Sequence, residues 1–405
     1  MSQLSSIFEG VACKVLTGNE FKNQHEFQGV HSLRKILGDD TSSKTFQANY
    51  FLFKDVDEVE RLQDEATWYD ARNNDPNRKA EFRLYYSAMA EDLVRRAQEG
   101  DTLIICKIKG ASEILIILAE AGSSILNSLE WLFRLDKQKQ RSPLVKGIGG
   151  PDDREIGWLE NYILEELGYE EVVPATSDYD EILLERFGLQ LPTTRVFSAF
   201  AREIAAIDYA CDDPDAALLK WYSTEDMLFR RMEKRIVEAR LQKGFVVNGD
   251  ADVDGFIKFS LSVQNRRKSR AGLAFENHLS EIFKACELKF DEQAITEGKK
   301  KPDFLFPGKA EYHSPDFPEI KLTLLAAKST CKDRWRQALS EAKRIQRKHL
   351  VTLEPGISSD QTDEMRSSLL TLVVPEEIQS TYSSEQCRHI LKLSNFIELV
   401  RAREV

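Results

Sequence analysis

An acidic residue and a lysine stand at the ends of two short apolar segments in the last third of the chain. Pro302-Asp303 opens the segment Asp303–Phe306, and Lys328 directly follows Leu322–Ala327. If these segments are neighbouring strands, the carboxylate and the ammonium can meet at one phosphate. The acid can then hold a divalent cation that polarises the phosphoryl oxygen and acidifies a water, while the lysine offsets charge on the pentavalent centre. The pair predicts metal-dependent phosphoryl chemistry.

The Pro-Asp pair is a weak signal by itself, because the chain contains four of them. Three of the four lie among turn-forming residues, where Pro and Asp are favoured anyway: Pro151-Asp152, Pro214-Asp215 and Pro315-Asp316. Only Pro302-Asp303 leads into an apolar strand. A turn or a strand cap is the competing interpretation of Asp303.

The elements around this pair predict an α/β domain. Leu273–Cys286 is helix-like, and Arg334–His349 has apolar residues at helical spacing. The segments Asp303–Phe306, Leu322–Ala327 and Leu369–Val374 are short and apolar, as buried strands are. Helix, strand, strand, helix, strand is an α/β order.

The rest of the chain predicts a β-rich first third followed by helices. Leu103–Ile108 and Ile114–Leu118 flank Lys109-Gly110-Ala111-Ser112, which predicts a hairpin. Further strands are predicted over Phe46–Phe53 and Glu81–Tyr86, a helix over Ser124–Leu135, a linker or long loop over 138–153, and a helical region over 158–240 that is interrupted near Leu191-Pro192 and Asp213-Pro214.

Composition is that of a globular protein of two or three domains, with 405 residues, 42% apolar and 30% charged. No apolar run approaches the roughly 18 residues that a membrane helix needs, and the first residues lack a signal peptide, so we expect a cytoplasmic protein with no membrane partner. The six cysteines lie far apart without a CxxC pair, which favours reduced thiols. Net charge is -11, yet basic residues concentrate in 265–270 and 299–301.

From about Asn265 onward the chain resembles the C-terminal catalytic domain of the EcoRII restriction endonucleases, and more weakly back to about Arg186. The matching stretches are Asn265–Gly272, Gln293–Gly298, Lys300–Pro307 and Thr330–Gln337. This resemblance implies a PD-(D/E)XK nuclease. Asp303 is then the metal-binding acid, Lys328 the catalytic lysine and Glu276 an acid on the preceding helix.

The chain departs from the superfamily motif at one position. The acid expected two residues before the lysine is Ala326, and the resemblance implies that Glu341, on the following helix, supplies the missing carboxylate and binds metal together with Asp303. From the residues alone, Glu341 and Glu276 are better explained as solvated helix carboxylates. Lys328 is less ordinary, since it ends an apolar strand that could bury its stem.

A rival mechanism uses Tyr312, which lies near lysines and arginines. A tyrosine in such a setting could be a covalent nucleophile of the kind found in DNA recombinases, with no metal needed. A second alternative is a DNA-binding regulator that keeps the fold and has lost cleavage. The presence of all four site residues argues against that regulator.

Basic residues near these positions suit contact with duplex DNA. The cluster after the lysine carries the donors and the acceptor that read G·C pairs, although an ordinary charged helix start is the competing explanation; it comprises Lys332, Asp333, Arg334 and Arg336. A second run suits phosphate contacts, unless it is a solvated loop; it comprises Arg266, Arg267, Lys268 and Arg270.

The N-terminal third resembles, by its strands and basic loops, the B3-like β pseudobarrel that binds DNA at the N-terminus of EcoRII. Its candidate contacts are Arg72, Arg78, Lys79 and Arg83. A structural or protein-binding β domain is the alternative. We therefore expect a β-barrel-like regulatory domain over 1–150, a linker and helical connection over 151–185, and a PD-(D/E)XK domain over 186–405.

Together these observations predict a type II restriction endonuclease that uses Mg²⁺ to cut duplex DNA at a CCWGG-like site. Cutting both strands of a near-palindrome requires two symmetry-related sites, so a homodimer is expected. The sequence does not determine the effect of base methylation.

Overall fold

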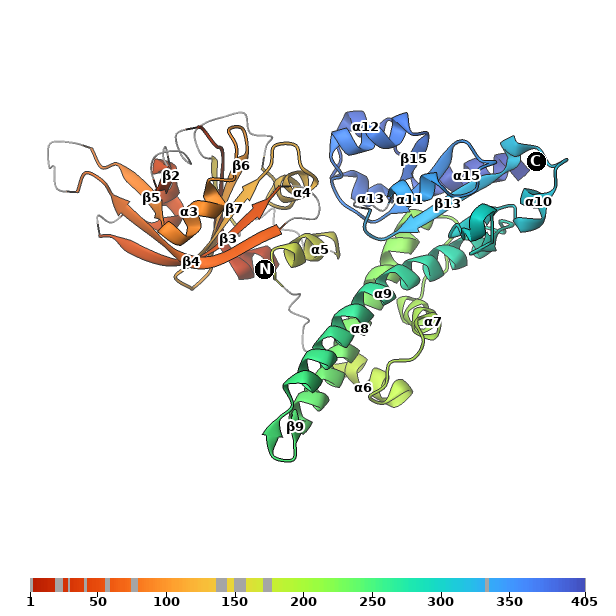
Figure 1. The fold of residues 1–405 in the computed structure, drawn as a ribbon, viewed down its shortest axis with the longest axis horizontal. Coiled ribbons are helices and arrows are strands. Elements are labelled where there is room, and N and C mark those ends of the chain that lie inside the picture. Colours follow the sequence, from red (N-terminus) through yellow and green to blue (C-terminus); the bar gives the residue numbers. More distant parts are fainter. Residues whose placement is uncertain are drawn as a thin grey trace. The chain divides into compact units, whose positions relative to one another are not determined.

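The chain, described here from a computed structural model, forms two compact units. The structure describes residues 3–18, 25–27, 30–39, 42–54, 59–73, 79–135, 144–148, 158–169, 177–331 and 335–404. The N-terminal unit comprises 1–170 with 355–359, and the C-terminal unit comprises 171–354 with 360–405. Together they make a multidomain α/β protein (Figure 1).

The N-terminal unit is built on one eight-stranded mixed sheet in the order β2-β5-β4-β3-β7-β6-β1-β8. Its strands are β1 Phe8–Val15, β2 Glu26–Phe27, β3 Lys44–Phe53, β4 Val59–Asp70, β5 Phe82–Tyr86, β6 Thr102–Ile108, β7 Glu113–Ala119 and β8 Leu144–Gly147. Its helices are α1 Gln3–Ile7, α2 Arg34–Leu37, α3 Ala88–Val94, α4 Ser124–Leu132 and α5 Trp158–Glu166. Strands β3 and β7 pair in parallel, and the other pairs are antiparallel.

An apolar core lies on each face of this sheet. Along β7, Ile114 and Ile116 belong to one core, and Leu115 and Ile117 belong to the other. Helix α3 packs into the first core, whereas α4 and α5 pack into the second. Alternate residues of a strand point to opposite faces, so a continuous apolar run is what such a sheet requires.

The predicted hairpin is confirmed, since β6 and β7 pair antiparallel around the turn at 109–112. The predicted loop over 138–153 is wrong in part, because Leu144–Gly147 forms strand β8 and pairs with β1. The predicted connection over 151–185 divides between the units, since Ile163 and Leu164 of α5 are buried in the N-terminal core.

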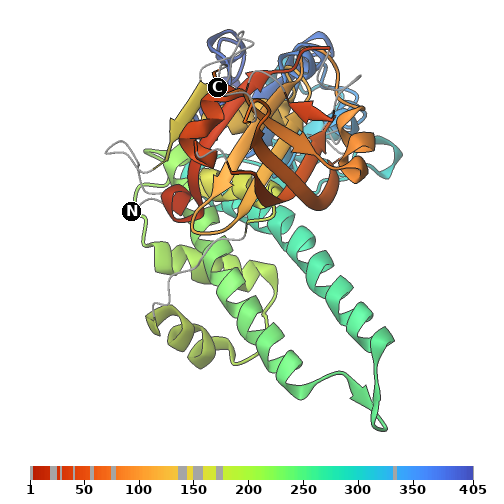
Figure 2. The same ribbon diagram turned by 90° about the vertical axis from the view of Figure 1, so that its left-hand side faces the viewer.

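The C-terminal unit begins with helices and a long helical hairpin. Its helices are α6 Ser177–Phe187, α7 Thr194–Ala205, α8 Pro214–Lys243, α9 Val253–Ala285, α10 Lys309–His313, α11 Trp335–Leu339, α12 Ser359–Ser367, α13 Glu376–Gln379, α14 Ser384–Cys387 and α15 Leu393–Glu404. Asp213 caps α8 by accepting from Ala216 N, with Pro214 in the first turn. Figures 1 and 2 both show α8 and α9 side by side, with β9 (Val246–Val247) at the far end of the hairpin.

A five-stranded mixed sheet follows in the order β11-β12-β13-β14-β15. Its strands are β11 Asp291–Glu292, β12 Phe304–Phe306, β13 Thr323–Lys328, β14 Lys348–Thr352 and β15 Leu370–Val373. The first three are antiparallel neighbours, and β13, β14 and β15 run parallel. Strand β14, between β13 and the edge strand β15, contributes only five residues, all of them buried.

An aromatic cluster joins this sheet to its helices. Phe283 of α9 contacts Phe304 and Phe306 of β12, with ring centroids 5.2 and 5.3 Å away, and Phe396 of α15 contacts Phe283 and Phe306. The buried carboxylate of Asp215, in the first turn of α8, accepts from the backbone N–H groups of Leu393, Ser394 and Glu376. The last helix is therefore part of the core.

Two predicted elements differ from the structure. The helix expected over Arg334–His349 ends at Leu339, because Ala342 adopts a left-handed backbone with φ of 44° and Lys348 and His349 belong to β14. The helix expected from Leu273 starts at Val253, so the basic run over 265–270 is helical rather than a loop.

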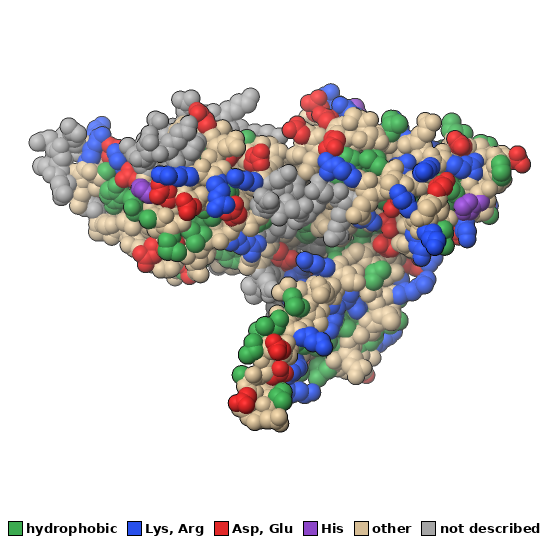
Figure 3. All heavy atoms as spheres, in the orientation of Figure 1, with side chains coloured by type: hydrophobic (Ala, Val, Ile, Leu, Met, Phe, Trp, Pro, Cys, Tyr) green, Lys and Arg blue, Asp and Glu red, His purple; other side chains and the backbone are tan. Residues whose placement is uncertain are grey.

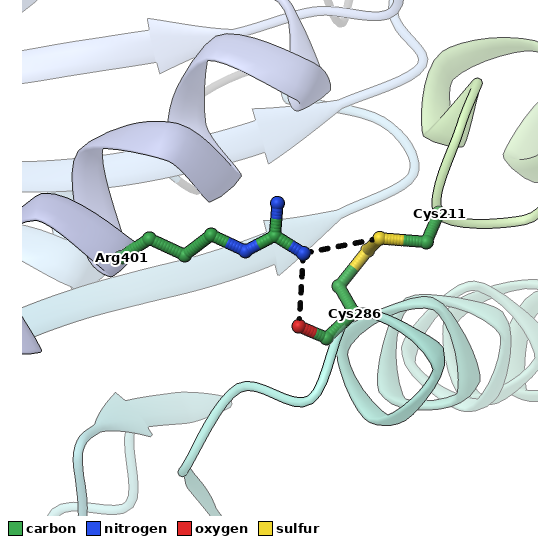
Figure 4. The surroundings of a disulfide bond; sticks show 3 residues. All are labelled: Cys211, Cys286 and Arg401. Atoms are coloured by element: carbon green, nitrogen blue, oxygen red, sulfur yellow. Dashed lines mark hydrogen bonds between the residues drawn. A yellow bond between two sulfur atoms is a disulfide. The ribbon is translucent and has the colours of Figure 1, made fainter.

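The expectation of six reduced cysteines is also corrected, since Cys211 and Cys286 form a disulfide with Cα atoms 5.1 Å apart. Arg401 donates to the carbonyl oxygen of Cys286 at 3.0 Å and to Cys211 Sγ at 3.2 Å (Figure 4). Among the described helices, none is long and apolar enough to cross a membrane.

Candidate active site

Asp303 and Lys328 meet at the ends of two neighbouring inner strands of the five-stranded sheet. Asp303 immediately precedes β12, and Lys328 is the last residue of β13. The antiparallel register pairs Phe304 with Leu325, which carries Asp303 toward the end of β13. Asp303 Oδ2 accepts from Lys328 Nζ and from the backbone N–H of Ala327, both at 2.8 Å. The buried carboxylate is thus fixed by two donors.

Glu276 joins this pair from the last third of α9. Gln293 donates from Nε2 to Glu276 Oε2 and to Asp303 Oδ1, both at 3.1 Å, so one amide reaches both carboxylates. Burial, and then the negative charge of Asp303, raise the pKa of Glu276 to about 7. A carboxyl group with this pKa exchanges its proton near neutral pH.

Glu341 approaches the same site, although from a bend rather than from the predicted helix. It lies two residues beyond the end of α11. Burial raises its pKa to about 7, and the charge of Asp303 acts in the same direction. The structure therefore brings Glu276, Lys328 and Glu341 together around Asp303.

The bend that carries Glu341 is held by hydrogen bonds from both sides. Lys343 N donates to Glu297 Oε2 at 3.3 Å, and Lys300 Nζ donates to the carbonyl of Ser340 at 2.9 Å. The Arg344 guanidinium donates to the carbonyls of Tyr312, Ser314 and Phe317. These bonds explain why the chain leaves the helix here, since tertiary contacts override local propensity.

Tyr312 is not available as a nucleophile. Its side chain is 1% exposed, and its hydroxyl donates to both carboxylate oxygens of Glu297, at 2.6 and 2.7 Å. Burial and this bond raise the pKa of the phenol. The recombinase-like alternative is therefore wrong, because the tyrosine supports the Glu341 bend instead.

The site has the oxygen donors that a magnesium ion prefers. No three His, Cys, Asp or Glu side chains in the described residues already form a cation cage. Mg²⁺ usually takes one or two protein carboxylates, with substrate phosphate and water completing its octahedron. Asp303 with Glu341 or Glu276 fits this pattern, and a bound cation would relieve the repulsion that raises the pKa of both glutamates.

The predicted base-reading residues Lys332, Asp333 and Arg334 lie outside the described residues. Arg336 is described: its guanidinium donates to both carboxylate oxygens of Glu364, at 3.0 and 2.9 Å, and covers the ring of Trp335. Arg336 thus braces α11 against α12. Any contribution to DNA binding requires that this surface ion pair open.

The basic run on α9 divides into exposed and buried residues. Arg267 and Lys268 are exposed and Arg266 is half-buried, and Arg267 is ion-paired with Glu233. Arg270 is only 9% exposed, donates to the carbonyl of Pro192, and stacks on two phenylalanine rings. Arg270 is therefore removed from the predicted phosphate contacts, because its side chain serves the helical core.

In the N-terminal unit the candidate contacts are tied to acids. Arg83 is bound to Glu26 and Glu81 at 2.8 Å each, and Arg72 is ion-paired with Glu81. Lys79 is exposed, and Arg78 lies outside the described residues. On the face drawn in Figure 3, Lys and Arg side chains are interspersed with Asp and Glu.

Sequence reasoning missed Gln293 and Glu297. Both lie in the stretch Gln293–Gly298, which carried the family resemblance but was assigned no chemistry. Gln293 contacts two carboxylates, and Glu297 holds the Glu341 bend. In the structure Gln293 stands out as a polar residue with a left-handed backbone, at a φ of 51°. The spacing of residues in the sequence does not show this conformation.

Two solved complexes show a limited structural similarity to this chain. One is metal-depleted Ecl18kI with uncleaved, modified DNA, at a TM-score of 0.43 and 18% identity, covering 56% of this chain and 83% of that one. The other is the complex of PspGI with substrate DNA, at a TM-score of 0.43 and 16% identity, covering 53% and 93%.

The sequence comparisons reach further. The model of the EcoRII C-terminal family matches residues 229–397. The type II restriction enzyme EcoRII of Escherichia coli is 46% identical over 318 residues, which cover 76% of this chain and 74% of that protein. The match to that relative extends well beyond the residues of the family model.

Proposed function

The chain belongs to the EcoRII family of type II restriction endonucleases, and we propose that it cuts duplex DNA with Mg²⁺ at the cluster of Glu276, Asp303, Lys328 and Glu341. The observation that supports this assignment best is the bond from Lys328 Nζ to Asp303 Oδ2 at 2.8 Å, with both high-pKa glutamates beside it.

Each residue of the cluster has a role that its contacts support. Bound Mg²⁺ supplies Lewis-acid activation of the phosphate and of a water. Asp303 and Glu341 hold the cation, and Glu276 provides a further carboxylate that can hold a proton near neutral pH. Lys328 turns its ammonium to the scissile phosphate and offsets the charge that develops there. The products carry 5′-phosphate and 3′-hydroxyl ends.

We further propose a homodimer that reads a CCWGG-like site. Arg and Lys can donate to guanine O6 and N7, and Asp can accept from cytosine N4, so Lys332, Asp333 and Arg334 suit the G·C pairs. The central pair is flipped out of the stack. Two symmetry-related active sites are needed for two strands.

The N-terminal unit is proposed to be a B3-like pseudobarrel that binds DNA and governs cutting. The proposal draws support from the large mixed sheet and from the exposed Lys79, which lies close in sequence to Arg72 and Arg83. A ligand shifts an active population only through its different affinity for two states. DNA bound at this unit would supply that difference.

The decisive experiment uses a plasmid that carries many CCWGG sites. We expect cleavage with Mg²⁺, none after EDTA, and none on a matched plasmid without such sites. Specific binding without cleavage in Mg²⁺ would favour the regulator alternative instead. Cutting of both plasmids alike would refute the target.

Deleting residues 1–170 tests the regulatory role. The deletion ends at residue 170, so that α5 is removed together with the N-terminal core into which it packs. The fragment should cut a single-site DNA at least as fast as the full chain. If the fragment is inactive or insoluble and the isolated N-terminal unit binds no DNA, the unit is structural.

A further inference from the structure

Gln293 occupies a fixed position between two acids of the candidate site. Its backbone N–H donates to the carbonyl oxygen of Asp303 at 3.1 Å, which continues the pairing of β11 with β12. Its backbone is left-handed, with φ of 51°. The side chain then reaches Glu276 and Asp303 with the same nitrogen, at 3.1 Å each.

The two carboxylates need such a donor because they repel each other. A primary amide has two N–H groups and no charge, so one nitrogen can donate to two acceptors at once. Asp303 Oδ2 is already taken by Ala327 N and Lys328 Nζ, which leaves Oδ1 for Gln293. Within the described part of the chain, Gln293 is the hydrogen-bond donor found at Glu276.

We propose that Gln293 is a positioning residue that holds Glu276 and Asp303 in one orientation, so that Glu276 stays beside the divalent cation that Asp303 binds. The proposal rests on the proposed function, since it presupposes that Asp303 binds the cation. Gln293 itself is exposed, so its side chain contributes little to the core. Its effect should therefore fall on cation binding and not on folding.

The expected magnitude follows from other metal sites. Residues that orient metal ligands through hydrogen bonds change metal affinity or activity by about 10- to 100-fold when they are replaced. Gln293 orients one proposed cation ligand and the acid beside it. We expect a loss in that range, with DNA affinity measured without metal unchanged within twofold.

The test uses two variants of the full-length protein and one control. Gln293→Met keeps the length and the strained backbone but removes the donor. Gln293→Gly also removes the donor, and it relaxes a positive φ that suits glycine. Gln190→Met makes the same chemical change at an exposed glutamine elsewhere in the unit. The readouts are Mn²⁺ binding by electron paramagnetic resonance and the Mg²⁺ concentration for half-maximal cleavage.

Support requires that both Gln293 variants lose about 10- to 100-fold in both readouts, while Gln190→Met matches the wild type. Values within twofold of the wild type for Gln293→Met would overturn the proposal. So would full recovery in Gln293→Gly, because the backbone and not the amide would then be responsible. A wild-type protein that neither binds Mn²⁺ nor cuts with Mg²⁺ overturns the proposed function itself, and the inference with it.

Discussion

The two sheets of the molecule use burial in opposite ways. In the N-terminal unit β7 is apolar on both faces, and Arg72 and Arg83 form ion pairs near the surface, such as that of Arg83 with Glu26. In the C-terminal unit, Asp303 and Lys328 stand at strand ends, where Asp303 is only 8% exposed. In the first sheet, burial of apolar side chains stabilises the fold. In the second sheet, charged side chains are held at strand ends, which reduces this stabilisation.

This difference predicts which property of the protein a substitution in each unit should change. A buried charge persists only when it is paired, so its partners and its pKa carry information about chemistry. An apolar residue that is buried in the core on either face of the sheet affects the stability of the fold. Changes in the two units should therefore affect different measurements.

The largest effect is expected from Asp303→Asn. Asparagine keeps an oxygen that can accept from Ala327 N but loses the charge that pairs with Lys328 and holds a cation. Cleavage should fall by at least about 10⁴-fold, as for other residues at the centre of a reaction. Initial rates on plasmid DNA and DNA affinity in Ca²⁺ measure the two properties separately. Retained cleavage would refute the site.

Trp68→Ala should damage the other unit instead. Trp68 is fully buried, stacks on Phe82 at 5.1 Å and donates to the carbonyl of Gly38 at 2.9 Å. Its loss should cost about 3–5 kcal/mol. Calorimetry should show a lowered transition for the N-terminal unit and an unchanged one for the C-terminal unit. An equal shift of both transitions would contradict the separation.

Glu276→Gln should stabilise the metal-free protein at high pH. The pKa of Glu276 is raised to about 7 in the folded state, so the unfolded state gives up its proton first and stability falls as pH rises from about 4.5 to 7. The variant avoids this cost. Allowing for solvent screening, we expect a gain of about 1–2 kcal/mol at pH 8 and little at pH 5. Urea unfolding in EDTA at both pH values checks the sign, and a gain at pH 5 alone would reverse it.

The smallest effect is expected from Glu81→Ala. Glu81 pairs with Arg72 and Arg83 near the surface, so its loss should change stability by less than about 1 kcal/mol. If those arginines contact DNA, freeing them should raise affinity a few-fold and steepen the salt dependence by up to about one unit for each contact. Unchanged binding by the isolated N-terminal unit would remove both arginines from the DNA-binding set.

The sequence predicted continuous strands well and the local path of the chain poorly. The hairpin of β6 and β7 was recognisable because apolar runs flank a turn. The segment after Trp335 was not, although Ala338, Ala342 and Ile345 are all buried as helical spacing suggests. The spacing of apolar residues indicated correctly which side chains are buried in this segment. Its backbone conformation is set instead by the hydrogen bonds of Arg344 to distant carbonyls. No local pattern reveals such contacts.

The candidate site was predictable in its residues and not in its supports. Asp303 and Lys328 could be named from strand ends, and Glu276 and Glu341 needed the family resemblance. Gln293 and Glu297 act through atoms brought close by folding, at sequence separations that no motif specifies. The prediction for Arg270 was wrong in the opposite sense. This residue was assigned to DNA contacts because it lies in a charged run, but its side chain is buried in the helical core.

The last helix, α15, is needed to complete the core of the C-terminal unit. Phe396 of α15 completes the aromatic cluster with Phe283, on the helix of Glu276, and with Phe306, on the strand that follows Asp303. Asp215 receives the start of the same helix. During synthesis these partners emerge from the ribosome long before residue 396 does, and domains fold as units when their parts are available. The aromatic cluster behind the nuclease centre is therefore complete only once residue 396 has been made.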